Sequence, residues 1–156
     1  MKKLSKKLQL LGLLALTLSV ALLSFTSPKG GEGFEIYLNN KLITQQYGKD
    51  VNTVKMIAID ESQADVQLTV KYWHCGQEGK NRILTVKDVN NKLLKQWRFA
   101  DAGKNNSSMC CGAKEILSLK TKNTGTLNLY YSSSQLPNGR LLATIALTNQ
   151  KSIARR

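Results

Sequence analysis

From Phe34 onward, polar turn residues divide the chain into short apolar runs, and no stretch keeps the 3.6-residue period of an amphipathic helix. The clearest run is Val66–His74, in which Val, Leu, Val and Tyr alternate with Gln, Thr, Lys and Trp. Alternation with a period of two is the pattern of a strand that buries one of its faces. The sequence therefore predicts a protein built from β-strands.

The same composition recurs between turns, which predicts further strands over 34–38, 41–47, 54–59, 82–89, 92–99, 113–120, 126–132 and 140–148. Asn39-Asn40 and Asn90-Asn91 each separate two of these segments, and asparagine tolerates the positive φ of a tight hairpin turn. Residues 100–108 are expected to form a long polar loop. About eight strands at intervals of roughly ten residues favour an all-β fold, an antiparallel β-sandwich with an immunoglobulin-like or related Greek-key path.

The first 26 residues have the composition of a secretory signal peptide with a hydrophobic helix. Residues 1–7 carry four lysines, and 8–23 form an apolar stretch without charge. Small residues at Ser24 and Thr26 predict cleavage after Thr26. The alternative is an uncleaved anchor, although the stretch falls short of the roughly 20 residues that span a bilayer. In both cases we expect export to the periplasm or the extracellular space, with membrane contact only through this segment if it is retained.

Without its leader the chain keeps 130 residues, the usual size of a single domain. Residues 27–33 are expected to form a flexible linker, 34–149 the sandwich, and 150–156 a basic tail. The mature part has 19 basic and ten acidic residues and a formal charge of +9, and its lysines are scattered, which favours a solvated surface. The expected partners are an anionic envelope polymer or another envelope protein; no nucleic acid and no cofactor are expected.

The three cysteines are Cys75, at the end of a predicted strand, and Cys110 and Cys111, just after the predicted long loop. Thiols outside the cytoplasm tend to oxidise, so a disulfide between Cys75 and either Cys110 or Cys111 is expected. Closing about 35 residues would stabilise the fold by roughly 3 to 4 kcal/mol. Neighbouring residues of an extended chain point in opposite directions, so only one of the pair can face Cys75. A strained bond between Cys110 and Cys111 is the alternative.

Soft metal ligands gather at two places in the chain, which suggests a copper or zinc site as an alternative function. The candidate ligands are His74, Cys75, Met109, Cys110 and Cys111. The usual Cys-x-x-Cys spacing is missing, and adjacent residues such as His74 and Cys75 would point to opposite faces of a strand. A Cys-His nucleophile meets the same geometric obstacle.

No catalytic constellation stands out in the sequence, so we expect a non-enzymatic binding or structural module of the bacterial cell envelope. A pair of unplaced carboxylates would make the second alternative, a small envelope hydrolase. Trp73 lies on the polar side of its predicted strand, where an aromatic ring can stack on a ligand. Together with Lys71, Lys95 and Arg98 it forms the predicted binding surface.

Overall fold

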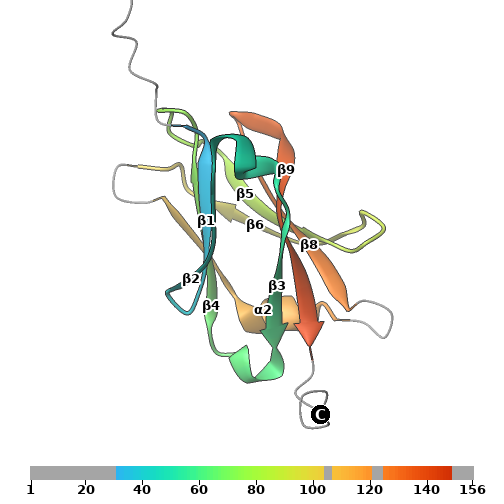
Figure 1. The fold of residues 1–156 in the computed structure, drawn as a ribbon. Coiled ribbons are helices and arrows are strands. Elements are labelled where there is room, and N and C mark those ends of the chain that lie inside the picture. Colours follow the sequence, from blue (N-terminus) through green and yellow to red (C-terminus); the bar gives the residue numbers. More distant parts are fainter. Residues whose placement is uncertain (1–30, 104–106, 121–124, 149–156) are drawn as a thin grey trace, which may run out of the picture.

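The computed structural model describes residues 31–103, 107–120 and 125–148 (Figure 1). The predicted signal peptide, most of the predicted linker and the basic tail lie outside these residues. Gly33, which the sequence placed in the linker, begins the first strand. In the part of the chain that the structure describes, no helix is long and apolar enough to cross a membrane.

The described residues form nine strands in two sheets. One sheet has the order β2-β1-β4-β7, with β1 (Gly33–Leu38), β2 (Lys41–Tyr47), β4 (Gln67–Trp73) and β7 (Ser108–Gly112). The other has the order β3-β9-β8-β5-β6, with β3 (Lys55–Asp60), β5 (Arg82–Lys87), β6 (Leu93–Phe99), β8 (Thr126–Ser133) and β9 (Leu136–Thr148). Figure 1 shows the sheets as two layers, so the prediction of an all-β sandwich is confirmed.

The two predicted hairpins are both present, but their turns are built differently. Asn39 and Asn40 have φ of 50° and 63°, and β1 and β2 pair antiparallel on either side of them. Between β5 and β6 only Asn91 has a positive φ. There the Asp88 Oδ1 accepts from the backbone N–H groups of Asn90 and Lys92, at 2.8 and 2.9 Å. The aspartate therefore shapes the second turn together with Asn91.

The prediction of a strand over 113–120 is wrong, because this segment begins with the helix α2 (Ala113–Ser118). The strand is the preceding β7, which pairs with β4 and takes up the end of the expected polar loop. Ala113 and Ile116, three residues apart on one side of the helix, are fully buried. Good helix formers occupy the exposed positions Lys114 and Glu115, which favours a short helix over the predicted strand.

The expectation of an entirely antiparallel sandwich is also corrected, because β3 pairs with β9 in parallel, with Ile57 opposite Ile145. The chain reaches β3 from β2 in the other sheet through the 3-10 helix η1 (Gly48–Asn52), whose Val51 is buried. A second 3-10 helix, η2 (Glu61–Gln63), leads from β3 towards β4. Since no hairpin joins β3 to β9, turn geometry does not impose an antiparallel direction on this pair.

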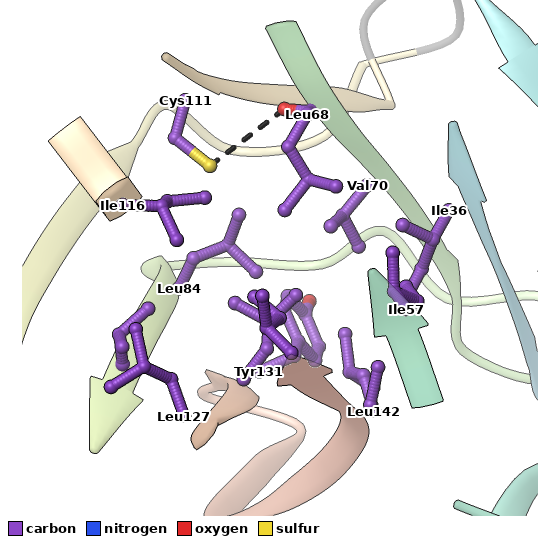
Figure 2. Packing of buried hydrophobic residues seen from close by; sticks show 14 of the residues in the cluster. Ile36, Ile57, Leu68, Val70, Leu84, Cys111, Ile116, Leu127, Tyr131 and Leu142 are labelled. Carbon is purple, nitrogen blue, oxygen red and sulfur yellow. Dashed lines mark hydrogen bonds between the residues drawn. The ribbon is translucent and has the colours of Figure 1, made fainter. Parts of the chain in front are cut away.

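The core lies between the sheets and draws on the inner face of each (Figure 2). Its fully buried members include Phe34, Ile36, Leu68 and Val70 from one sheet and Leu84, Leu127, Leu129 and Leu142 from the other. Figure 2 shows Cys111 above Ile116 and beside Leu68, whose carbonyl oxygen lies 3.7 Å from the Cys111 sulfur. The core therefore does not need the side chains on the outer faces of these strands, and those side chains are available for binding.

Candidate binding face

The outer side of the four-stranded sheet carries three rows of residues across β2, β1 and β4. Gly33 of β1 lies between Tyr47 and Trp73, and Glu35 lies between Gln45 and Lys71. One step further along β1, Tyr37 is opposite Thr69 of β4. We call the following set the aromatic face: Glu35, Tyr37, Gln45, Tyr47, Lys71 and Trp73.

The missing side chain of Gly33 makes room for the Tyr47 ring. A Cβ built at Gly33 would overlap the Tyr47 ring and lie 2.8 Å from the carbonyl oxygen of Gln46. The tyrosine can therefore cross the central strand towards Trp73, and the two ring centroids are 6.0 Å apart with an angle of 38° between the planes. The two rings form an angled aromatic pair over Gly33.

Glu35 fixes both tyrosines of the aromatic face. Its Oε1 accepts from Gln45 Nε2 and from the Tyr47 hydroxyl, each at 2.9 Å, and its Oε2 accepts from the Tyr37 hydroxyl at 2.5 Å. The hydrogen bond to Glu35 raises the pKa of Tyr37, while burial, ahead of Glu35, raises that of Tyr47. Both phenols therefore keep their protons at neutral pH, and the rings are held in place before any ligand arrives.

Lys71 places the one cation of this set above an aromatic ring, with its Nζ 4.8 Å from the centroid of Tyr37. Its backbone is paired with that of Glu35 on the neighbouring strand. One carboxylate and one ammonium thus share the face, and its formal charge is balanced even though the protein as a whole is basic.

Two hollows meet at Trp73 and Gly76, at the end of β4. The first, of about 490 Å³, is lined by Gly31, Tyr47, Trp73 and Gly76. The second, of about 270 Å³, is lined by Trp73, by Gln77 and Glu78 in the loop after β4, and by Ser107. The larger hollow has the size of small-molecule binding sites. Trp73 therefore stands between two adjoining depressions.

The inner side of β4 holds a closed group of polar side chains. The Nε2 of His74 lies 2.9 Å from the Tyr131 hydroxyl and 3.1 Å from the Ser133 Oγ. The Tyr72 ring stacks on that of Tyr131 with centroids 4.2 Å apart. Burial is the main reason why the pKa of His74 is lowered, and it outweighs the attraction of Glu32 for the protonated form. The imidazole is therefore neutral at pH 7.

An ion pair at the start of β1 continues this buried group. Arg140 Nη1 lies 2.8 Å from Glu32 Oε2, and the Tyr72 hydroxyl donates to Glu32 Oε1 and accepts from Arg140, each at 2.5 Å. Burial opposes ionisation of Glu32, but the hydrogen bonds from Tyr72 and Arg140 outweigh it and lower the pKa of this carboxyl. The carboxylate thereby ties the beginning of the domain to β9.

Ser133 and His74 are in contact as a nucleophilic hydroxyl and its general base would be, but they lack the solvent access and the carboxylate partner of a catalytic pair. Ser133 is 5% exposed and His74 7% exposed. In the described residues no carboxylate is hydrogen-bonded to His74, whose Nε2 is shared between Ser133 and Tyr131. A substrate could not reach this hydroxyl without opening the core, so the group is suited to fixing the end of the sandwich rather than to catalysis.

The structure brings two of the four predicted surface residues together. Lys71 and Trp73 both belong to the aromatic face. Lys95 of β6 instead pairs with Glu115 of α2, with the two charged atoms 3.3 Å apart. Arg98 lies on the outer side of the five-stranded sheet, opposite Ile83.

Sequence reasoning missed four members of the aromatic face: Glu35, Tyr37, Gln45 and Tyr47. A usable signal was present, because outward positions of the first two strands read Glu-x-Tyr and Gln-x-Tyr, just as β4 reads Lys-x-Trp. Polar and aromatic residues at alternating outward positions of adjacent strands meet on one face. The face could therefore have been found by aligning the hairpin partners.

The expected disulfide is not formed, and all three cysteines are free. In the β4–β7 pairing, Cys110 is opposite Thr69 and Cys111 is opposite Leu68. Cys75 lies six residues further along from Thr69, about 20 Å away in an extended chain, whereas a disulfide requires Cα atoms within about 7 Å. Cys110 points outwards and Cys111 inwards, so these neighbours do take opposite directions.

The five candidate metal ligands lie in different surroundings. Met109 and Cys111 belong to the core, and His74 Nε2 contacts Tyr131 and Ser133. Cys75 and Cys110 are exposed and lie far apart, since Cys75 follows the end of β4 and Cys110 of β7 is opposite Thr69. Across the described ranges, no three His, Cys, Asp or Glu side chains are grouped as a metal site requires.

No family model matches this chain, and no curated protein matches it. Among solved structures, it is similar to two structures of the extracellular domain of one protein, BT4673 from B. thetaiotaomicron, which is described in one as a hybrid two-component system and in the other as a one-component system. Each comparison has 11% identity and a TM-score of 0.37. The alignments cover 78% and 79% of this chain but 16% of each of those chains. A likeness of this strength assigns neither a family nor a function.

Proposed function

We propose that the protein is an exported, non-enzymatic binding module of the bacterial cell envelope and that the aromatic face is its ligand site. The observation that carries this proposal is the outward pair of Tyr47, whose hydroxyl is held by Glu35 and Gln45, and Trp73, beside two adjoining hollows. Both rings lie on a sheet whose opposite side already supplies its share of the core. Aromatic rings held in place on an outer face are available for a ligand at little further cost in conformational entropy.

Export is supported by the lysine-headed apolar leader over residues 1–26. The free thiols do not contradict this location, since Cys75 is too far from Cys110 and Cys111 to form a bridge even where thiols oxidise. Intact mass of the protein from the periplasm or the medium would test cleavage, with loss of residues 1–26 as the expected result. Full-length protein found in the cytosol would contradict export.

We also infer that the sandwich follows an immunoglobulin-like Greek-key path. The chain passes from β4 to β5 in the other sheet, returns to β7 beside β4, and then enters β8 beside β5. Two adjacent strands in each sheet linked by crossovers between the sheets are the interlocked core of such folds. The parallel neighbour β3 at the end of the five-stranded sheet fits the same path.

The binding proposal is tested by mixing purified protein with the insoluble envelope fraction of the bacterium that produces it and measuring the protein left in solution. We expect wild-type protein to be depleted and Trp73→Ala to bind about tenfold more weakly or worse, since removing a central aromatic anchor often weakens binding by 1.4 kcal/mol or more. Trp73→Phe, which keeps a ring, should retain part of the binding.

The matched control is Tyr130→Ala. Tyr130 is a partly exposed tyrosine on the outer side of the other sheet, with Lys87 Nζ 4.7 Å from its ring centroid, just as Tyr37 is covered by Lys71. This variant should bind as the wild type does, and thermal melting should show that both variants are folded. Equal depletion of wild type and Trp73→Ala, or no depletion of wild type, would overturn the proposal.

A further inference from the structure

We infer that the ligand of the aromatic face is a neutral glycan chain, an inference that rests on the proposed role of this face as a ligand site. A pyranose ring has a flat side of C–H groups and a rim of hydroxyls. It therefore needs an apolar ring surface with hydrogen-bonding groups beside it. The aromatic face offers this combination.

The apolar part is the angled pair of Tyr47 and Trp73 above Gly33. The polar part lies next to that pair. Glu35 and Gln45 follow in the next row of the sheet, and Gln77 and Glu78 line the second hollow together with Trp73. Their carboxylate and amide groups can accept from and donate to hydroxyls at the rim of a sugar.

The arrangement of the hollows indicates a chain rather than a single sugar. Trp73 lines both depressions, one on the side of Tyr47 and one along Gln77 and Glu78. A ligand that occupies both must continue past the indole ring, which requires at least two linked units. A linear polymer satisfies this requirement, and its successive rings would contact Tyr47 and Trp73 together.

The charge of the face excludes a polyanion as its preferred ligand. Glu35 and Glu78 flank the aromatic pair, and the cation of the face, Lys71, lies over Tyr37. Nucleic acids and acidic polymers are bound through several Lys and Arg contacts to their phosphates or carboxylates. The overall basic charge suggested an anionic polymer, but the basic residues are not concentrated here.

A protein partner fits this face less well than a glycan. A stable protein interface covers about 800 Å² on each side and excludes water from its centre. At the centre of the aromatic face lie the Glu35 carboxylate and, on the neighbouring strand, Lys71. Burying both charges in a dry interface would incur a large desolvation penalty, whereas a glycan leaves the contact hydrated.

The class of ligand is tested on the same insoluble envelope fraction after two treatments. Periodate cleaves the carbon–carbon bond between adjacent hydroxyl-bearing carbons of sugars, and protease digestion removes protein. We expect periodate to reduce binding of wild-type protein about tenfold or more and protease to leave it unchanged. Loss of binding after protease with retention after periodate would overturn the glycan inference in favour of a protein partner.

Salt distinguishes a neutral glycan from an anionic one. Raising NaCl from about 50 to 500 mM should change the affinity for the envelope less than twofold, because only charged contacts are screened. A tenfold loss would overturn the inference in favour of an anionic polymer. If binding is lost after protease treatment or at high salt, the proposed binding function still holds as long as Trp73→Ala lowers depletion of the protein from solution by untreated envelope. Absence of depletion in untreated envelope overturns the module itself.

A direct measurement uses Trp97→Phe, which leaves Trp73 as the single tryptophan. Trp97 donates to Glu115 of α2, away from the aromatic face, so this variant should bind like wild type. Glycan chains released from the envelope by glycoside hydrolases should shift the fluorescence of Trp73, and Tyr47→Ala should weaken that response about tenfold. An unchanged spectrum with the released chains would contradict the inference.

Discussion

The two sides of β4 use the same kinds of residue for opposite purposes. Inwards, Tyr72 and His74 are buried, and their polar atoms contact other side chains of the protein. Outwards, Lys71 and Trp73 belong to a face where hydrogen bonds hold the edges of the tyrosine rings and leave ring surface exposed. The difference shows that the type of residue does not decide whether an aromatic side chain in a strand can bind a ligand. What decides is the side of the sheet to which it points and the groups that it contacts there.

Side chains that point into the space between the sheets should therefore determine stability, and the largest single contribution is expected from Arg82 of β5, in the opposite sheet. This side chain is 1% exposed, and its Nε and Nη1 donate to the carbonyl oxygens of Ala100 and Ser107, at 2.7 and 2.9 Å. Arg82→Met leaves both carbonyls without these donors, and we expect about 3 kcal/mol lower unfolding free energy, measured by urea denaturation.

Arg98→Ala is the control on the outer side of the same sheet, one strand away. Its side chain is exposed, so its removal should change the unfolding free energy by less than about 0.5 kcal/mol. Equal effects of the two substitutions would show that the inner polar residues are not the ones that hold this end of the sandwich.

The comparison between the inner and outer sides of this sheet can also be tested on β7, the neighbour of β4. Its adjacent residues Cys110 and Cys111 point to opposite sides of the sheet. Burial raises the pKa of the Cys111 thiol to about 12, so it is protonated as well as covered. A maleimide should label Cys75 and Cys110 quickly and Cys111 about a hundredfold more slowly or worse. Mass spectrometry should find two labels on the native protein and three in denaturant.

Fewer than three labels on the unfolded, unreduced protein would reveal a disulfide and contradict the structure. Equal labelling rates for Cys110 and Cys111 would instead show that β7, at the edge of its sheet, opens readily. Either result would show that the inner and outer sides of the sheet do not differ at β7 as the structure indicates.

Much of the fold could be predicted from local pattern, because alternation and turn residues act over a few neighbours. The strand at Val66–His74 and the Asn39-Asn40 turn are of this kind. The helix α2 was missed because it has six residues, fewer than two turns, which is too short for a helical period to emerge. The parallel pairing of β3 with β9 depends on contacts between distant segments, which no local pattern records.

The candidate site was predicted only in part for the same reason. Trp73 and Lys71 were found because both are outward residues of one clear strand. Lys95 and Arg98 were grouped with them as further cations near aromatic residues, but their strand lies in the other sheet. The disulfide was predicted from the tendency of exported thiols to oxidise. Whether Cys75 can reach Cys110 depends on the register between β4 and β7, which that tendency does not determine.

A smaller effect is expected from the titration of His74, the one histidine of the chain. Burial lowers its pKa in the folded protein, so between the ordinary value of 6.5 and the lowered one the unfolded chain binds more protons. Stability from this group is thus fully present above pH 6.5 and is lost as the pH falls through the folded pKa. Urea denaturation between about pH 7.5 and 5 should show this decline.

His74→Gln should flatten that decline while keeping a polar group near Tyr131 and Ser133. Glu32 does not contribute in this window, because its lowered pKa lies below the ordinary 4.5 and it stays ionised. An equally steep decline in the variant would mean that the inner side of β4 is not the origin of the pH dependence.

The smallest change of side chain tests whether the position of the Tyr47 ring beside Trp73 determines binding. Gly33→Ala removes no aromatic group, but its Cβ would overlap the Tyr47 ring. The exposed Tyr47 ring can turn aside, but the Cβ would also lie 2.8 Å from the backbone carbonyl oxygen of Gln46, so β2 must shift as well. We therefore expect a stability loss of about 1 to 2 kcal/mol and a severalfold weaker binding to the envelope. Gly125→Ala, where a Cβ meets no atom within 4 Å, is the matched control and should leave binding unchanged. If Gly33→Ala binds as well as wild type, the fixed angle between Tyr47 and Trp73 has no role in recognition, and the outer rings differ from the inner ones only in being exposed.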